Sequence, residues 1–206
     1  MKKRIPINLA VEDDLSEFVL RRVLKERRVV YDVGPVYGHR GFGYLKKQAA
    51  GFNNAAKACP FLLLTDLDKT SCAPKLVAEW LGSGRRAQRQ FIFRVAVREV
   101  ESWLLADERN LGAFLGLRKM RPISDPERLP DPKATLLEVA AEARRDLREA
   151  IVWRDERGGR FVQGPDYNGA LAPYVKEAWD IDRARTRCPS LAGLFEALAR
   201  LERGYR

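Results

Sequence analysis

In the first half of the chain, short apolar runs typical of β-strands alternate with segments whose apolar positions have helical spacing. Four short apolar runs have the composition of β-strands and end at turn or charged residues; they are residues 5–11, 29–36, 61–65 and 91–97. The segments between them carry apolar positions at helical spacing. This order predicts an α/β fold with a mostly parallel sheet flanked by helices.

The helices between these strands have recognisable starts. Asp13 or Asp14 is placed to cap the first helix with its side-chain oxygen. The next two are expected at residues 44–58 and 74–81, and a fourth follows the last strand at residues 99–105.

The amino-acid composition of the chain changes after residue 117. Residues 118–133 are rich in proline and charge, which indicates a linker or a long surface loop. The remainder is predicted to be helical, with a turn at residues 157–159 and a last helix from Ser190 that carries an apolar stripe. We therefore expect an α/β domain at residues 1–117 and a helical extension, residues 118–206, packed on it.

Composition adds two expectations about the class of protein. Hydrophobic residues make up 46% of the chain, which is enough for a core. The net charge of +10 suits an anionic partner, and nucleic acid is the commonest one, although an arginine-rich proteome would give a similar excess.

The cysteines and the lengths of the apolar runs give an expectation for the cellular compartment of the protein. Three cysteines without C-x-x-C spacing argue against a disulfide framework or a zinc site and for a reducing cytosol. Neither a signal-peptide pattern nor a run of about 20 apolar residues is present. The sequence thus predicts a cytoplasmic protein with no membrane association.

A single histidine, His39, narrows the chemistry. It lies in a glycine-rich segment, and the chain has no G-x-S-x-G motif for a serine hydrolase. A zinc site built from several histidines is also excluded. In an enzyme, carboxylates, arginines and lysines would therefore carry the chemistry.

Acidic residues follow two of the predicted strands. Glu12 comes after the first strand, and Asp66 and Asp68 come after the third. The carboxyl ends of parallel strands lie together, and alternation along an extended segment would turn both aspartates to one side. Such carboxylates suit Mg²⁺ or Mn²⁺. The alternative is that these acids only end the strand and cap the next turn.

Glu12 also begins a run of acids that includes Asp13, Asp14 and Glu17. Like charges this close repel one another unless a cation or the positive end of a helix relieves them. Helix capping accounts for Asp13 or Asp14, and it accounts less well for Glu12.

A third acidic segment follows the fourth strand and contains Glu99 and Glu101. Their spacing places them on different faces of a helix, so they cannot serve one site equally. One of them is expected to join the acidic cluster, and the other to form a salt bridge.

Basic residues near glycines give candidates for phosphate binding. Residues 38–47 combine glycines with Arg40, Lys46 and Lys47, and backbone N–H groups in such loops can approach an anion. Lys133 is a further candidate for contact with a nucleic-acid backbone. The alternative is a flexible turn with solvated lysines.

Three short motifs together resemble the TOPRIM-like families, especially small bacterial relatives of OLD-type nucleases. They are Val11-Glu12, residues 64–68 (LTDLD) and residues 96–107 (AVREVESWLLAD), within about the first 115 residues. The resemblance implies a TOPRIM-like, Rossmann-like fold in which Glu12, Asp66 and Asp68 bind Mg²⁺.

The same resemblance implies further acids and an activity. Glu17 and either Glu99 or Glu101 would add to the cluster, although Asp13 replaces the usual glycine and Glu17 is displaced by one position. The implied activity is Mg²⁺-dependent cleavage of nucleic acid, in phage defence or repair. The substrate, a partner ATPase and the oligomeric state are left open.

Two other functions stay open. Asp66 and Asp68 also fit the D-x-D-x-T motif of haloacid-dehalogenase-like phosphatases, in which they would be nucleophile and general acid. That family normally has this motif on its first strand, whereas two predicted strands precede it here. The other alternative is a nucleic-acid-binding module of TOPRIM-like fold without catalytic activity.

Overall fold

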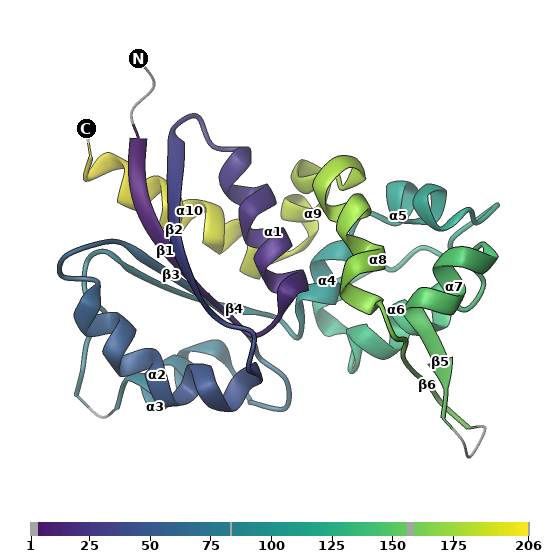
Figure 1. Cartoon of the computed structure of the whole chain (residues 1–206), viewed down its shortest axis with the longest axis horizontal. Coiled ribbons are helices and arrows are strands. Elements are labelled where there is room, and N and C mark those ends of the chain that lie inside the picture. Colours follow the sequence, from purple (N-terminus) through teal and green to yellow (C-terminus); the bar gives the residue numbers. More distant parts are fainter. Residues whose placement is uncertain (1–3, 83, 156–158, 206) are drawn as a thin grey trace. The chain divides into compact units, whose positions relative to one another are not determined.

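A parallel four-stranded sheet is built from the first half of the chain (Figure 1). The computed structural model describes residues 4–82, 84–155 and 159–205. The strands are β1 (Arg4–Val11), β2 (Val30–Gly38), β3 (Phe61–Asp66) and β4 (Phe91–Ala96). Their spatial order is β2-β1-β3-β4, and all three pairings are parallel. The predicted α/β class is therefore confirmed.

The order of the strands reverses direction at β1. The chain passes from β1 to β2 on one side and then returns to place β3 on the other side of β1. The two central strands are consequently β1 and β3, and the first five residues of β3 are all buried. Burial on both faces explains why β3 is a continuous apolar run without alternation.

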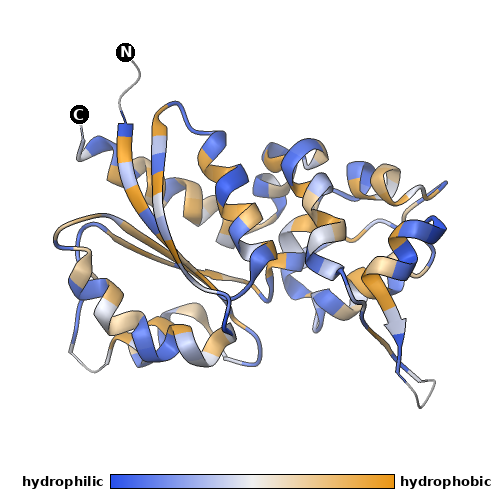
Figure 2. Cartoon of the chain, in the orientation of Figure 1, coloured by the Kyte–Doolittle hydropathy of each residue, from blue (hydrophilic) through white to orange (hydrophobic). Residues whose placement is uncertain are grey.

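Helices cover both faces of this sheet (Figures 1 and 2). One face carries α1 (Asp14–Lys25) and α10 (Pro189–Arg203), and the other carries α2 (Gly41–Ala55) and α3 (Ala73–Leu81). The core under α2 and α3 is rich in aromatic rings, which pack with centroids 4.9 to 5.9 Å apart. These helices fix the sheet that carries the acidic residues at its carboxyl ends.

The C-terminal helix α10 belongs to the same compact unit as the sheet. Unit 1 comprises Met1–Val97 and Ser190–Arg206, and unit 2 comprises Arg98–Pro189. Arg27 binds Glu202 on α10 through two hydrogen bonds of 2.7 and 2.8 Å, and Tyr31 donates to the same carboxylate at 3.0 Å. This contact holds the end of α10 to the segment between α1 and β2.

Unit 2 consists mainly of short helices. They are α4 (Val100–Leu105), α5 (Glu108–Leu115), the 3-10 helix η1 (Pro126–Arg128), α6 (Pro132–Ala140), α7 (Arg145–Ile151), α8 (Tyr167–Pro173), the π-helix η2 (Tyr174–Ala178) and α9 (Ile181–Arg187). Trp103, Trp179, Tyr167 and Tyr174 fill its core and are almost fully buried. Hydrogen bonds join these buried residues; for example, Trp179 Nε1 donates to the carbonyl of Trp103 at 3.2 Å.

Unit 2 also contains an antiparallel hairpin that the sequence does not predict. Its strands are β5 (Val152–Arg154) and β6 (Phe161–Gln163). Residues 157 and 158 of the predicted turn lie outside the described residues, while Gly159 is described. The helical region expected before this turn consists of two helices, α6 and α7.

The segment predicted as a linker is part of unit 2, and the predicted boundary at residue 117 lies inside this unit. The guanidinium group of Arg187, on α9, donates to the carbonyl of Ile123, and Pro126 is buried. The segment rich in proline and charge is therefore a surface segment that is hydrogen-bonded to the rest of unit 2. No helix in the described part of the chain is long and apolar enough to cross a membrane.

One glycine is required where β2 pairs with the end of β1. Gly38 has φ +127°, and a Cβ atom at this position would overlap the carbonyl oxygen of Val11. Gly43, in the first turn of α2, has an ordinary φ, and a Cβ atom there would meet nothing within 4 Å beyond its own helix. The two glycines thus differ in what a methyl group would meet.

We expect Gly38→Ala to lower the free energy of unfolding by at least about 2 kcal/mol, because it combines backbone strain with steric overlap. Gly43→Ala is the matched control and should leave stability unchanged or raise it by up to about 1 kcal/mol, as expected in a helix. Urea unfolding followed by circular dichroism measures both. Equal stability of the two variants would contradict this account.

Candidate functional site

The candidate site begins where β1 and β3 end side by side. Their register pairs Ala10 with Leu63, so two positions further on Glu12 comes next to Thr65. The hydroxyl of Thr65 donates a hydrogen bond to Glu12 Oε1. The backbone N–H of Asp66 donates to the same oxygen at 3.1 Å. Parallel pairing therefore fixes the position of the Glu12 carboxylate.

The environment of Glu12 favours its neutral form more than water does. Burial raises the pKa of Glu12, and the negative charges of Asp68 and Asp13 add to this effect. The hydrogen bonds from Thr65 and from the Asp66 amide act in the opposite direction but do not cancel it. Asp68, in the turn after β3, is therefore one of the charges that act on the carboxylate after β1.

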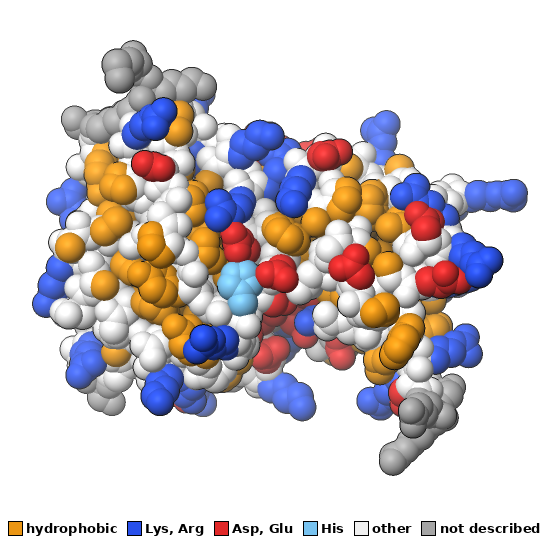
Figure 3. All heavy atoms as spheres, in the orientation of Figure 1, with side chains coloured by type: hydrophobic (Ala, Val, Ile, Leu, Met, Phe, Trp, Pro, Cys, Tyr) orange, Lys and Arg blue, Asp and Glu red, His pale blue; other side chains and the backbone are white. Residues whose placement is uncertain are grey.

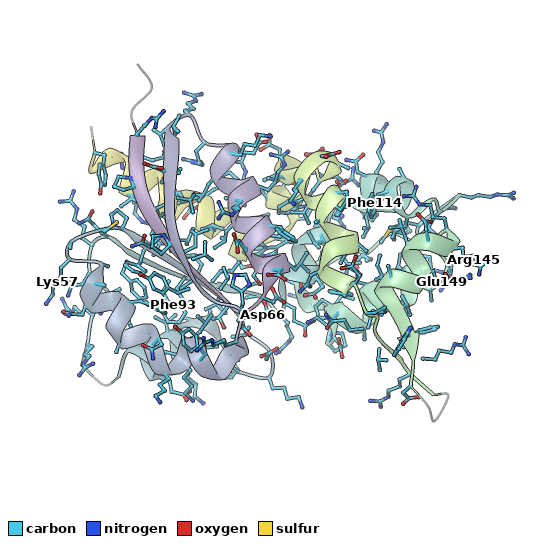
Figure 4. All side chains as sticks on the ribbon, in the orientation of Figure 1. Lys57, Asp66, Phe93, Phe114, Arg145 and Glu149 are labelled. Atoms are coloured by element: carbon cyan, nitrogen blue, oxygen red, sulfur yellow. The ribbon has the colours of Figure 1, made fainter. Side chains whose placement is uncertain are left out.

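The backbone changes direction immediately after β3. Asp66 is the last residue of the strand and is half-buried at the end of the sheet (Figure 4). Leu67 turns into the core, and its N–H donates to the carbonyl of Ala96 at 2.9 Å. Asp68 is exposed and has φ +48°, in the left-handed region that few residues other than glycine adopt.

The left-handed backbone at Asp68 corrects one of the expectations from sequence. Strand alternation was expected to turn Asp66 and Asp68 to the same side, but the extended backbone ends at Asp66. A tight turn, closed by the N–H of Thr70 and the carbonyl of Leu67 at 3.0 Å, sets the direction of Asp68 instead. Asparagine and aspartate tolerate this conformation better than most residues do.

The loop between β2 and α2 is bonded to the end of β1. The N–H of His39 donates to the carbonyl of Val11, and that of Gly41 donates to the carbonyl of Glu12, both at 3.2 Å. His39 Nδ1 lies 2.7 Å from Asp14 and Nε2 lies 2.9 Å from Glu17. Acidic side chains are visible next to the histidine in Figure 3.

The acidic residues that follow Glu12 have partners of their own. The side chain of Asp13 accepts the N–H of Ser16 at 2.8 Å and so caps α1, as predicted. Glu17, a predicted metal ligand, contacts His39 and also accepts a 2.6 Å hydrogen bond from Arg21. A metal ion at Glu17 would have to compete with Arg21 and His39, whereas Glu12 faces neutral donors.

The predicted phosphate-binding residues of unit 1 differ in their surroundings. Arg40 precedes α2 and lies over the ring of Tyr44, with 5.5 Å from its guanidinium carbon to the ring centroid. Lys46 forms a 2.6 Å ion pair with Glu79 of α3. Lys47 is exposed on α2. All three are exposed, Lys46 is held by an acidic side chain, and contact with an anion stays a prediction for all three.

Glu99 and Glu101 belong to unit 2, while Glu12, Asp66 and Asp68 belong to unit 1. Glu101 is only 2% exposed. Its carboxylate accepts a 2.8 Å hydrogen bond from Tyr167 and lies 3.4 Å from Lys133 Nζ. Lys133, predicted to contact nucleic acid, therefore compensates a buried charge inside its own unit.

Glu99 is bound to the start of α6. Its carboxylate accepts the backbone N–H of Lys133 at 2.8 Å. Burial, followed by the neighbouring charge of Glu101, raises the pKa of Glu99 to about 6. The expectation that one of these glutamates forms a salt bridge fits Glu101, while a metal role for Glu99 stays a prediction.

Thr65 is a site residue that the sequence analysis did not name. It is 1% exposed and is the polar exception at the end of an otherwise apolar strand. A buried hydroxyl needs a hydrogen-bond partner. This local pattern, a threonine directly before an acidic motif, was the available signal.

The donor set suits a hydrated cation better than a closed metal cage. Within the described ranges, no three His, Cys, Asp or Glu side chains are grouped so that they could hold one ion. Mg²⁺ is commonly held by one or two carboxylates, with water and phosphate oxygens as its other ligands. Two of the carboxylates of Glu12, Asp66 and Asp68 could supply such a pair, whereas the described residues do not show all three grouped around one ion.

The raised pKa of Glu99 predicts how stability depends on pH. The folded state holds the proton up to about pH 6, whereas the ordinary value is 4.5. The stability that protonation provides is therefore complete below pH 4.5 and lost as pH rises through 6. We expect a loss of about 1 kcal/mol after allowing for partial exposure.

Urea unfolding between about pH 4 and 7 tests this expectation. Glu99→Gln should remove that part of the pH dependence, because the amide does not titrate. Glu142→Gln, outside the core of the same unit, is the control and should follow the wild type. Parallel curves for Glu99→Gln and wild type would show that Glu99 does not titrate in this range.

Comparisons with known proteins identify a family. Neither a curated protein nor a solved structure matches the chain. A family model described as a domain of unknown function, DUF4276, matches residues 12–199, which span the strand ends and most of both units. The chain therefore belongs to the DUF4276 family.

Proposed function

We propose that the protein is a divalent-cation-dependent enzyme that cleaves phosphodiester bonds in nucleic acid. The observation that carries this proposal is the Glu12 carboxylate, held by Thr65 and the Asp66 amide at the junction of β1 and β3. Asp66 ends the neighbouring strand, and Asp68 lies in the turn after it.

The position of this junction in the sheet supports a ligand site. In open α/β sheets, ligands bind outside the carboxyl ends of the strands where the strand order reverses. That reversal lies between β1 and β3 in this sheet. The adjacency of a glutamate-ending strand and a D-x-D-ending strand is also what the resemblance to TOPRIM-like proteins implies.

The proposal assigns the cation to two of the three carboxylates of Glu12, Asp66 and Asp68, with water and phosphate oxygens as its other ligands. A bound Mg²⁺ or Mn²⁺ would polarise a phosphoryl oxygen and promote ionisation of a bound water. Thr65 orients Glu12 through its hydroxyl, and the Asp66 amide fixes the same oxygen. The turn after β3 presents Asp68 to solvent, where a phosphate-bearing ligand can reach it.

Charge and exposed aromatic surface support a nucleic-acid substrate. The net charge is +10, and Arg40 and Lys47 lie on the same unit as the acids. In unit 2, Trp153 on the β5–β6 hairpin is 60% exposed and is followed by Arg154. Exposed aromatic rings with nearby arginines stack on unpaired bases with little sequence preference.

The first experiment measures cation binding and cleavage together. Isothermal titration of Mg²⁺ and Mn²⁺ is compared for wild type, Asp66→Asn/Asp68→Asn and the control Asp182→Asn, which removes an exposed acid on α9. Plasmid and single-stranded DNA and RNA are incubated with each protein in parallel. We expect binding and cleavage in wild type and the control, and neither in the double variant.

Two results would contradict parts of this proposal. Cation binding without cleavage of any nucleic acid would leave the metal site and remove the nuclease assignment, in favour of a non-catalytic binding module. No cation binding by the wild type would remove the metal site itself. DNA binding with a steep salt dependence but no Mg²⁺ requirement would then indicate a purely electrostatic interaction.

Thr65 provides a second, more specific test. Residues that orient a metal ligand typically contribute about ten- to a hundredfold to metal affinity. We expect Thr65→Val, which keeps the shape but removes the donor to Glu12, to weaken Mg²⁺ binding by about tenfold. Thr65→Ser keeps the hydroxyl and should retain most of the affinity. Equal affinity of the two variants would show that the hydrogen bond does not position Glu12 for metal.

A further inference from the structure

The outer edge of β4 offers backbone groups to a further strand. Within the described part of the chain, β4 pairs with β3 only. The N–H of Phe61 donates to Gln90 at 3.0 Å, and that of Leu67 donates to Ala96 at 2.9 Å. Along a strand, the backbone N–H and C=O groups of successive residues point to opposite sides. The backbone groups of the even-numbered residues of β4 therefore point toward β3. The N–H and C=O groups of Phe93 and Val95 therefore face the open edge.

A groove of about 600 Å³ runs along this edge. We call it the β4 groove; residues 91–94 of β4 form its base, Val77 of α3 lines one side, and Arg200 and Leu201 of α10 line the other. Side chains of β4 alternate between these sides. Phe91 and Phe93 belong to the apolar core under α3, and Arg94 lies against α10 at Gly193.

The α10 side of the β4 groove has an excess of positive charge. Arg94 is half-buried, and its buried Nε atom has no hydrogen-bond partner within the described residues. Burial, and then the charge of Arg200, lower the pKa of Arg94. The charge of Glu196 acts in the opposite direction, and its carboxylate lies 3.9 Å from Arg200 Nη1. Arg89 adds a third cation to the lining.

Gly193 makes room for the guanidinium group of Arg94. A Cβ atom at residue 193 would overlap Arg94 Nη2. The helix therefore lacks a side chain where the arginine approaches it. A buried cationic group that lacks a full set of acceptors is stabilised by an incoming carboxylate.

We propose that the β4 groove binds an extended acidic segment of a partner protein, which adds to the sheet as a fifth strand. The backbone of the segment would pair with Phe93, which lines the groove, and continue along the same edge to Val95, beyond the lining, as in other complexes formed by strand addition. Its side chains would alternate, with carboxylates toward Arg94 and Arg200 and apolar groups toward Val77 and Phe93. This binding mode is independent of the acids at the ends of β1 and β3.

Charge argues against a second copy of this chain as the occupant. Pairing two β4 edges would bring Arg89, Arg94 and Arg200 of one copy close to those of the other, and like charges at an interface are unfavourable. The opposite edge of the sheet is less suited to strand addition. There, β2 contains Pro35 and the charged Asp32, and its register with β1 is interrupted.

The test uses fluorescent synthetic peptides and the full chain. An eight-residue peptide of alternating glutamate and valine is compared with a block-sequence peptide of the same composition and with an alternating lysine–valine peptide. Fluorescence anisotropy should show saturable binding of the first peptide only. Hydrogen exchange should show protection of the Phe93 and Val95 amides when this peptide is added.

Two arginines of α10 provide a matched pair of variants. Arg200→Gln, which lines the groove and is exposed, should weaken binding of the alternating acidic peptide by about three- to tenfold. Arg203→Gln removes the same charge outside the lining and should leave binding unchanged.

Several outcomes would overturn the proposal. They are failure of the alternating acidic peptide to bind, equal binding of the block-sequence peptide, or equal effects of the two arginine variants. Concentration-dependent dimerisation in sedimentation experiments, lost in Arg200→Gln, would assign the groove to a second copy instead.

Discussion

The parallel pairing of β1 with β3 is the constraint on which the candidate site depends. It brings Glu12 and Thr65, which are 53 residues apart in sequence, into hydrogen-bonding contact. It also supplies the backbone amide of Asp66 to the same carboxylate. Because both strands are central in the sheet, helices on both faces restrain them. A polar arrangement at their ends is thereby held by the most buried part of the molecule rather than by the loops that surround it.

The sequence predicts this part of the fold well because its signals are local. Long apolar runs define the strands, and the acids that end them are expected to converge at one edge of a parallel sheet. The direction of Asp68 could not be predicted in this way, since a left-handed backbone ends the alternation. The contact of Glu17 with His39 was also not foreseen, because it requires the path of the loop after β2.

Unit 2 was less predictable because its key contacts are distant in sequence. Glu101 is compensated by Lys133, 32 positions later, and by Tyr167, 66 positions later. Neither partner is marked by a local pattern. The strands of the β5–β6 hairpin have three residues each, too few to show alternation. The segment rich in proline and charge looked like a linker, yet the carbonyl of Ile123 accepts a hydrogen bond from Arg187, 64 positions later.

The return of the chain to the sheet through α10 has a consequence for biosynthesis. Unit 1 consists of two stretches of sequence, and the whole of unit 2 lies between them. During translation, the four strands leave the ribosome long before the helix that covers one of their faces. Apolar residues such as Leu62 and Ile92 are buried in the folded protein. We expect them to stay exposed, or bound by a chaperone, until the last helix has been synthesised. Unit 2 is under no such restriction, since its residues form one continuous stretch and can fold as soon as they emerge.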